Sequence, residues 1–256
     1  MIDRAGVSHG IRRRYGASLR PEWLEQCAKH IENDLQRARD SSSNQRMHLE
    51  VQTRLVLEQL LHSDISDSCY PALDLDSTSG KVLSLPSHPG AFLQVQEIMD
   101  IGVSKYAMWE AVREKEDFEQ RGIRPSYLPL MEDEESEASN VFTAAGTQQT
   151  HPSQTPSLDS SSPGERQPKI PHGMLKLTLT DGRATVSALE LAPIAQLSVE
   201  LPIGTKVLVS SGQFLEPTGT LSLAPTGIRV LGGAPEQYSA STLKARLSKL
   251  LQLDAR

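Results

Sequence analysis

Three residue types of a hydrolytic triad stand side by side in the run His62-Ser63-Asp64. In such a triad a serine attacks, a histidine takes its proton and an acid orients the histidine. Neighbours in the chain do not give this geometry, because the three side chains must converge from separate elements. Serine and aspartate are also common where one helix ends and the next turn begins. We therefore expect this run to close a helix, with Ser63 or Asp64 capping the turn, and predict no catalytic residue.

The sequence carries no recognisable signature of metal, cofactor or nucleotide binding. The seven histidines and two cysteines are not spaced like metal ligands. Gly232-Gly233 lacks the following lysine that a phosphate-binding loop needs. Cys27 and Cys69 are too few for a disulfide framework and fit a reduced intracellular compartment, so we expect both to be buried. We expect no cofactor, no metal site and no enzymatic activity.

Charge and aromatic content argue against tight binding of nucleic acid by the chain alone. The net charge is −6 and aromatic residues make up 4% of the sequence, whereas single-strand binders need a basic groove and stacking platforms. Between Gly173 and Pro235 the only aromatic residue is Phe214, and four basic residues are matched by four acidic ones. We expect DNA to be bound weakly or only through a complex.

Signals for targeting are weak. No run approaches the roughly 20 apolar residues that span a bilayer, so we expect no membrane association. The first residues lack the apolar core of a secretory signal. Arg12-Arg13-Arg14 is either part of a nuclear signal or a solvated basic end, and the run alone does not separate the two.

Two amphipathic helices are predicted near the N-terminus. The first begins at Pro21, because proline suits the first helical turn. Its apolar face comprises Trp23, Leu24, Cys27, Ile31 and Leu35. The second follows a polar run over 40–45, and its apolar side comprises Leu49, Val51, Leu55, Val56, Gln59, Leu60 and Leu61. Two helices that are each apolar on one face need a third element to pack against. Residues 3–17 or the following barrel could supply it. We assign residues 1–75 to a small helical bundle.

Short strands then predict a β-barrel over residues 85–235. Ala91–Ile98 is a first strand, and Leu175–Thr180 alternates apolar and polar residues before the turn signal Asp181-Gly182. Further β-rich runs are Ala184–Leu191, Thr205–Ser210, Gly219–Leu223 and Gly227–Val230. An amphipathic helix within residues 236–256 closes the chain, and it could cover the barrel or dock on a partner.

A long insertion, residues 105–171, separates the first two barrel strands. Ser104 can cap a helix over Lys105–Gln120, with Tyr106 and Trp109 along one side. An acidic run and a Ser/Pro-rich run follow, and this composition predicts partial disorder. Tyr127 and Phe142 are among the few apolar residues there that could anchor a partner. Such an insertion within a compact domain is commonly functional.

Lys206 is the barrel residue that stands out. It follows Gly204-Thr205 at the entry to a predicted strand. A long cation at that position can project from the barrel rim towards an acidic partner, or it can be a solvated lysine that discourages pairing of an exposed strand.

Blocks of sequence along the chain resemble the N-terminal part of the RecQ-mediated genome instability protein 1 family. In order, they are Trp23–Cys27, Gln59–Asp64, Leu93–Val95 with Asp100-Ile101, Leu175–Gly182, Leu201–Lys206 and Leu231–Gly233. A Tudor-domain-containing relative that partners a topoisomerase III paralogue is similar over the same region, but its corresponding loop is short. The long insertion favours the first family, and the short chain resembles its fungal-type members.

The resemblance implies an α+β protein: a small helical bundle, then a five-stranded oligonucleotide/oligosaccharide-binding (OB) barrel with the insertion and a C-terminal helix. It implies a nuclear, non-catalytic partner of topoisomerase III and a RecQ-family helicase, acting in double Holliday junction dissolution. The expected partner-binding residues are Lys206, Tyr106, Trp109, Tyr127 and Phe142. The alternative is an autonomous barrel that binds single-stranded DNA.

Overall fold

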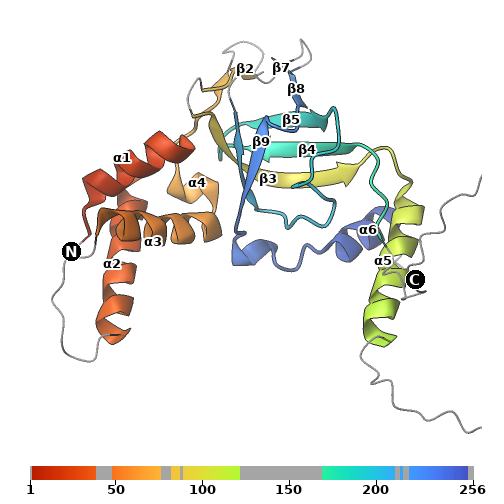
Figure 1. Ribbon diagram of the computed structural model, residues 1–256, viewed down its shortest axis with the longest axis horizontal. Helices are drawn as coiled ribbons and strands as arrows, with labels where there is room; N and C mark the ends of the chain where they lie inside the picture. The colour runs from red at the N-terminus through yellow and green to blue at the C-terminus, as the bar shows by residue number, and fades with distance from the viewer. Residues whose placement is uncertain are drawn as a thin grey trace, which may run out of the picture. The chain divides into compact units, whose positions relative to one another are not determined.

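The computed structural model describes residues 2–38, 48–75, 82–86, 89–121, 169–210, 214–215 and 219–252. Helices gather at the N-terminal end, and a curled sheet follows (Figure 1). The predicted α+β class, with a helical bundle before an OB barrel, is therefore confirmed. None of the helices in these ranges is long and apolar enough to cross a membrane.

The helical bundle consists of α1 (Arg4–Tyr15), α2 (Pro21–Ala38), α3 (Leu49–His62) and the short α4 (Ile65–Ser68). Helix α1 supplies the third element that the two predicted helices required. Asp3 caps its N-terminus, with its side chain accepting from Gly6 N, and Gly16 caps its C-terminus in a left-handed conformation (φ 70°). Its buried residues Val7 and Ile11 share one core with Val56 and Leu60 of α3.

The barrel sheet has the strand order β7-β8-β5-β4-β3-β6-β9. Its members are β3 (Ala91–Asp100), β4 (Leu175–Thr180), β5 (Thr185–Glu190), β6 (Lys206–Val209), β7 (Phe214–Leu215), β8 (Thr220–Leu223) and β9 (Ile228–Gly232). All neighbours are antiparallel except β5 and β8, which run parallel. A separate two-stranded sheet pairs β1 (Asp74–Leu75) with β2 (Val82–Ser84).

One segment of chain joins the two sides of this sheet. Strand β8 pairs with β5, whereas β9 pairs with β6 on the other side. The two strands are separated by a single turn, closed by Gly227 N donating to Ala224 O at 2.8 Å. The sheet must therefore curl, and β8 and β9 together fill the place of the fifth strand of an OB barrel.

The helix α6 (Leu243–Leu251) follows the short 3₁₀ helix η1 (Glu236–Tyr238) and covers the barrel. Leu247 is buried in the barrel core. Arg246 donates from Nη1 to Ile98 O at 2.9 Å and from Nη2 to Val199 O at 2.6 Å. Of the two roles considered for this helix, covering the barrel is the one that the structure shows.

The bundle and the barrel share a contact through Phe92. This residue lies on β3, yet its buried side chain belongs to the core of the bundle. Its neighbours Ala91 and Leu93 face the barrel core instead, because successive side chains of a strand point to opposite sides. Strand β3 thus has one apolar face for each domain, which explains the near-continuous apolar run at its start.

Candidate functional site

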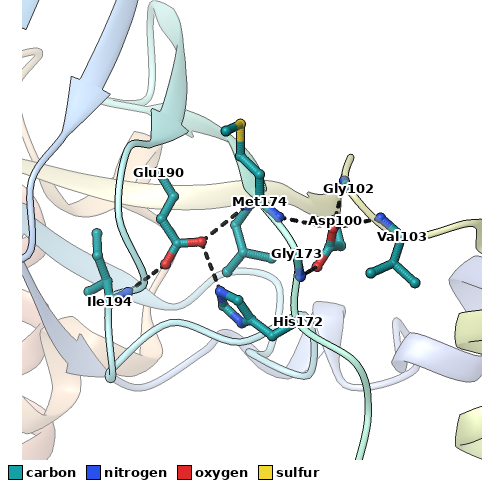
Figure 2. A network of polar contacts seen from close by, with 9 residues as sticks. Asp100, Gly102, Val103, His172, Gly173, Met174, Glu190 and Ile194 are labelled. Carbon is teal, nitrogen blue, oxygen red and sulfur yellow. Dashed lines mark hydrogen bonds and ion pairs between the residues drawn. The ribbon is translucent and has the colours of Figure 1, made fainter.

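The base of the insertion is held by the buried carboxylate of Asp100, the last residue of β3. Its Oδ1 accepts from Gly102 N at 2.8 Å, Val103 N at 3.0 Å and Met174 N at 3.2 Å. Its Oδ2 accepts from Gly173 N at 2.6 Å. Figure 2 shows these bonds reaching both the departing and the returning chain. One charged group therefore ties together the two ends of the insertion by strong, charge-assisted hydrogen bonds.

The two ends approach so closely that a side chain would not fit between them. A Cβ added to Gly173 would lie 2.8 Å from Asp100 Oδ1 and 2.9 Å from Gly102 Cα. Real Cβ atoms do not come this close to other heavy atoms, so glycine is required at this position. The close approach brings the backbone amides within reach of the single carboxylate.

A second buried carboxylate, Glu190 at the end of β5, holds the same region from the other side. It is 2% exposed. Its Oε2 accepts from Leu175 N at 3.1 Å and lies 3.0 Å from His172 Nε2, and its Oε1 accepts from Ile194 N at 2.6 Å. Figure 2 shows the His172 ring reaching up to this carboxylate from the returning chain. The start of β4 is therefore fixed on both of its sides.

Three apolar side chains stand on the outer side of this base, and we call them the apolar rim: Ile101, Met174 and Leu191. Asp100 pairs with Leu175, and Ile101 N donates to Met174 O at 2.8 Å, so Ile101 and Met174 are the next pair. Extending the β4–β5 register from Lys176 and Leu189 places Leu191 opposite Met174. The exposed fractions are 51% for Ile101, 42% for Met174 and 62% for Leu191.

The rim is exposed because the preceding row of side chains is buried. Asp100, Leu175 and Glu190 point inward, with at most 2% of their surface exposed. Strand geometry sends the next residue of each strand to the opposite side. Figure 2 shows the Met174 side chain pointing away from both carboxylates. The two carboxylates thus fix the backbone that carries an exposed apolar row.

The helix α5 (Lys105–Arg121) leaves this base with two of the predicted site residues in its first turns. Ser104 caps it as predicted, since its Oγ accepts from Ala107 N at 3.1 Å. Tyr106 is 57% exposed and stacks on Trp109, with ring centroids 6.2 Å apart. Met108, which the sequence analysis did not single out, is buried in the barrel core together with Val112. A partner-binding role for Tyr106 and Trp109 stays a prediction.

Two other predicted site residues, Tyr127 and Phe142, lie outside the described residues, as do 122–168 as a whole. The predicted contacts of these two residues stay predictions. The residues that sequence reasoning missed are Asp100, Glu190 and His172 together with the apolar rim. The run Asp100-Ile101-Gly102 could have indicated a local turn around an aspartate, but its bonds to residues 173 and 174 depend on strand register.

The expectation that Lys206 projects from the barrel rim is wrong. Its side chain is 0% exposed. Its Nζ donates to Leu61 O and Gly204 O, both at 3.0 Å. Leu61 lies in the last turn of α3, where carbonyl groups have no partner within the helix, and the lysine supplies one. Sequence reasoning treated this side of the barrel as free, whereas the bundle packs there.

Burial lowers the pKa of Lys206 to about 8, against the opposing effect of the negative charge of Asp64. A neutral lysine still donates hydrogen bonds, so the contacts with Leu61 O and Gly204 O do not require the charged form. Lys206 is therefore a structural residue at the junction between bundle and barrel.

Asp64 is the second polar residue of this junction. Its Oδ1 accepts from Ser66 N at 3.0 Å, which caps α4 as predicted. Its Oδ2 accepts from Gln237 Nε2 at 2.8 Å and Tyr238 Oη at 3.1 Å. Burial acts to raise the pKa of Asp64, but hydrogen bonds from Ser66, Gln94 and Tyr238 outweigh it and hold the pKa below its ordinary value.

The neighbours of Asp64 do not form a triad with it. Ser63 Oγ donates to Leu60 O at 2.9 Å, and His62 Nδ1 lies 3.3 Å from Ala234 O. The run closes α3, as predicted. Cys27 and Cys69 are buried free thiols, which confirms their assignment as small core residues. Within the ranges that the structure describes, no group of three metal-ligating side chains comes together.

Comparison with known proteins gives two matches to family models. The model described as "RMI1, N-terminal helical domain" matches residues 11–68, and the one described as "RMI1, N-terminal OB-fold domain" matches residues 74–246. The second covers more than half of the chain.

Individual relatives agree with these models. The chain is 28% identical over 229 residues to RecQ-mediated genome instability protein 1 of Danio rerio, a match that covers 89% of this chain and 35% of the relative. It is 26% identical over 233 residues to the Xenopus laevis protein of that name, covering 91% and 34%. A shorter match to the Arabidopsis thaliana protein reaches 44% over 63 residues, covering 25% and 10%. The chain spans about a third of the length of its vertebrate relatives.

Proposed function

The chain belongs to the RecQ-mediated genome instability protein 1 family, and on this premise we propose that it is a non-catalytic subunit of a complex containing topoisomerase III and a RecQ-family helicase. It binds the topoisomerase through the barrel and the inserted loop. In that complex it promotes the dissolution of double Holliday junctions and so protects genome stability in the nucleus. DNA is contacted weakly or through the complex.

The observation that carries this proposal is the base of the insertion. Asp100 binds four backbone amides from both ends of the loop, so the loop leaves the barrel at a fixed place. The apolar rim stands on this fixed backbone with about half of its surface exposed. An exposed apolar row on a rigid support is typical of a protein–protein contact, since preorganised backbone lowers the entropy lost on binding.

Co-purification with the cognate topoisomerase III tests this function. The intact chain and a variant in which a short Gly/Ser linker replaces residues 122–168 are each mixed with the enzyme and passed over a sizing column. We expect the intact chain to co-elute and to alter the rate of DNA decatenation. If the intact chain does not associate, the proposal fails. If the variant alters decatenation as the intact chain does, the role of the loop fails while the barrel contact stands.

The alternative, an autonomous single-strand binder, is tested by fluorescence anisotropy with a labelled oligonucleotide. Lys176 and Arg183 are exposed cations on the barrel and are suitable for substitution by glutamate, in contrast to the buried Lys206. Micromolar binding that weakens with salt and with these substitutions would favour the alternative. We expect binding weaker than this, because between Gly173 and Pro235 the barrel has balanced charge and one aromatic residue.

A further inference from the structure

A groove on the helical bundle is separate from the apolar rim. It lies between α1 and α3 and has a volume of about 570 Å³. Helix α1 contributes Gly6, Gly10 and Arg13 to its lining, and α3 contributes Leu49 and Thr53. Both helices are held from below by the bundle core, in which Ile11 and Val56 are fully buried. The groove is therefore formed by packed helices and not by a loose segment.

The floor of the groove is apolar around Gly10 and Leu49, whereas at Gly6 the Asp3 carboxylate lies close by, since a Cβ added there would meet Asp3 Oδ2 at 2.5 Å. Gly6 and Gly10 are four residues apart and so lie on the same face of α1. A Cβ added to Gly10 would meet Thr53 Oγ1 at 3.6 Å and Thr53 Cγ2 at 3.7 Å. The Thr53 hydroxyl donates to Leu49 O at 2.8 Å, so its hydrogen is already used within α3. Leu49 stands at the edge with 42% of its surface exposed. An apolar side chain of a ligand fits this floor without displacing a protein hydrogen bond.

The walls of the groove are basic. Helix α1 holds four arginines and no acidic residue. The net charge of the chain is −6, so this helix contributes +4 and the remaining residues −10. Arg13, Arg14 and His9 line the groove, opposed by the carboxylate of Glu50 and, at the Gly6 end, by that of Asp3. Glu50 Oε1 lies 3.7 Å from Arg14 Nη2, and both side chains are largely exposed. An acidic ligand can replace this weak pair at little cost.

We propose that this groove binds an acidic peptide segment of a partner protein. An apolar side chain of that segment packs on Gly10 beside Leu49, and its carboxylates pair with Arg13 and Arg14. Arginines in the last turn of a helix also favour the helix dipole, but that effect does not explain their position beside an open apolar floor. A peptide fits this combination better than a nucleic acid, which would use stacking platforms. The inference goes beyond the proposed function and uses a different surface.

The test is an anisotropy titration of the full chain with a labelled helical probe peptide of about 16 residues. The probe carries two leucines four residues apart on a background of glutamate and alanine, and a second probe has glutamine in place of glutamate. We expect the acidic probe to bind and the glutamine probe to bind at least about 10-fold more weakly, because carboxylate–arginine pairs are lost. Added salt should weaken binding of the acidic probe, because it screens the charge pairs.

Four substitutions locate the binding. Arg13→Glu should weaken binding of the acidic probe about 10-fold, and Glu50→Gln should strengthen it about 3-fold, since each changes the charge of the groove wall. Gly10→Ala should weaken it a few-fold by filling the floor, with no loss of fold, because the added methyl makes ordinary contacts. Arg183→Glu is the matched control, since Arg183 is exposed on the barrel and does not line the groove. It should change binding by less than about 2-fold.

Three results would overturn the proposal. The first is a dissociation constant above about 1 mM for the acidic probe. The second is an equal loss with Arg13→Glu and Arg183→Glu, which would mean attraction by general charge. The third is tighter binding of an oligonucleotide of equal charge at the same residues, which would make the groove a nucleic-acid surface. None of these results affects the test of topoisomerase binding, which uses the barrel.

Discussion

Asp100 and Lys206 are both buried charged side chains, yet they hold two different kinds of structure together. Asp100 binds four backbone amides within a few residues of the two ends of the insertion. Lys206 binds two carbonyls, one in its own turn and one at the end of α3, 145 residues away along the chain. The Asp100 carboxylate thus accepts hydrogen bonds at the base of the insertion, and the Lys206 ammonium group donates hydrogen bonds at the junction between bundle and barrel.

The difference lies in what each group leaves unpaired when it is removed. Backbone amides and carbonyls that are buried without a partner destabilise a fold by about 1–3 kcal/mol each. Asp100 binds four amides of exposed or half-buried residues, so each contributes at the low end of this range, whereas Lys206 binds two carbonyls, one of them buried. Burial also disfavours the charged form of Lys206, as its lowered pKa indicates. Removing this buried charge therefore offsets part of the stability lost with the two hydrogen bonds. The loop base should therefore be the more sensitive of the two.

The largest effect is expected for Asp100→Ala, which leaves four amides without their acceptor. We expect a loss of about 3 kcal/mol in the free energy of unfolding. In hydrogen exchange, the amides of Gly102, Val103, Gly173 and Met174 should become faster while that of Leu177 stays protected. Glu110→Ala, at an exposed carboxylate on α5, is the control and should change stability by less than about 0.5 kcal/mol. Equal losses in the two variants would contradict the role given to Asp100.

A smaller loss is expected for Lys206→Met, which keeps the length of the side chain but removes its donors. Leu61 O and Gly204 O lose a partner, and the relief of a buried charge offsets part of this, so we expect a loss of about 1–2 kcal/mol in chemical denaturation. Lys176→Met, on the exposed face of β4, serves as the control. A stability unchanged by Lys206→Met would show that the junction does not depend on the ammonium group.

The pH dependence of stability sharpens the role of Lys206. The pKa of Lys206 is about 8 in the folded protein, against 10.5 for an ordinary lysine, which we take for the unfolded chain. Between pH 8 and 10.5 the unfolded chain therefore binds more protons than the folded one, and the contribution of Lys206 to stability rises with pH. Burial raises the pKa of Cys27 and Cys69 to about 11 from 9.0, and stability therefore falls with pH over that range. The Lys206 charge acts to lower the pKa of Cys69, but with a pKa of about 11 folded Cys69 stays mostly protonated up to pH 10 in wild type and in Lys206→Met alike, so below pH 10 the cysteine effect is nearly the same in both. The difference in their unfolding free energies should thus grow from pH 8 to 10, and a flat difference would contradict the lowered pKa.

The smallest effect is expected for His172→Gln at the loop base. The His172 side chain is one-third exposed, and Glu190 keeps its bonds from Leu175 N and Ile194 N without it. We expect a loss of about 0.5 kcal/mol or less in the free energy of unfolding. A loss as large as that of Asp100→Ala would mean that the histidine, and not the backbone amides, holds the returning chain.

The strands were predictable because their signals are local. Leu175–Thr180 matches β4 in both bounds, and the predicted strand at Ala91 begins where β3 begins. Alternation of apolar and polar residues is readable within six residues. Even here, Asp181 does more than mark a turn: its Oδ2 accepts from Ala72 N and Leu73 N, which lie 109 and 108 residues away. The sequence pattern gives no access to such distant partners.

The site was less predictable because it depends on register and on domain packing. The apolar rim exists only once β3, β4 and β5 are aligned so that three outward residues form one row. Lys206 was misplaced for a related reason, since its burial requires the end of α3 to lie against the entry of β6. A lysine after a turn is ordinarily solvated, and only the position of Leu61 O changes that expectation.

The most direct test of the proposed topoisomerase contact is the affinity of two leucine variants for the cognate topoisomerase III, measured by titration. Leu191→Asp places a charge on the apolar rim, and Leu250→Asp makes the same change at a leucine of α6 that is 46% exposed. We predict that Leu191→Asp weakens binding at least about 10-fold and that Leu250→Asp leaves it within about 2-fold. Equal affinities for Leu191→Asp and the wild type would contradict the assignment of the rim as the binding surface.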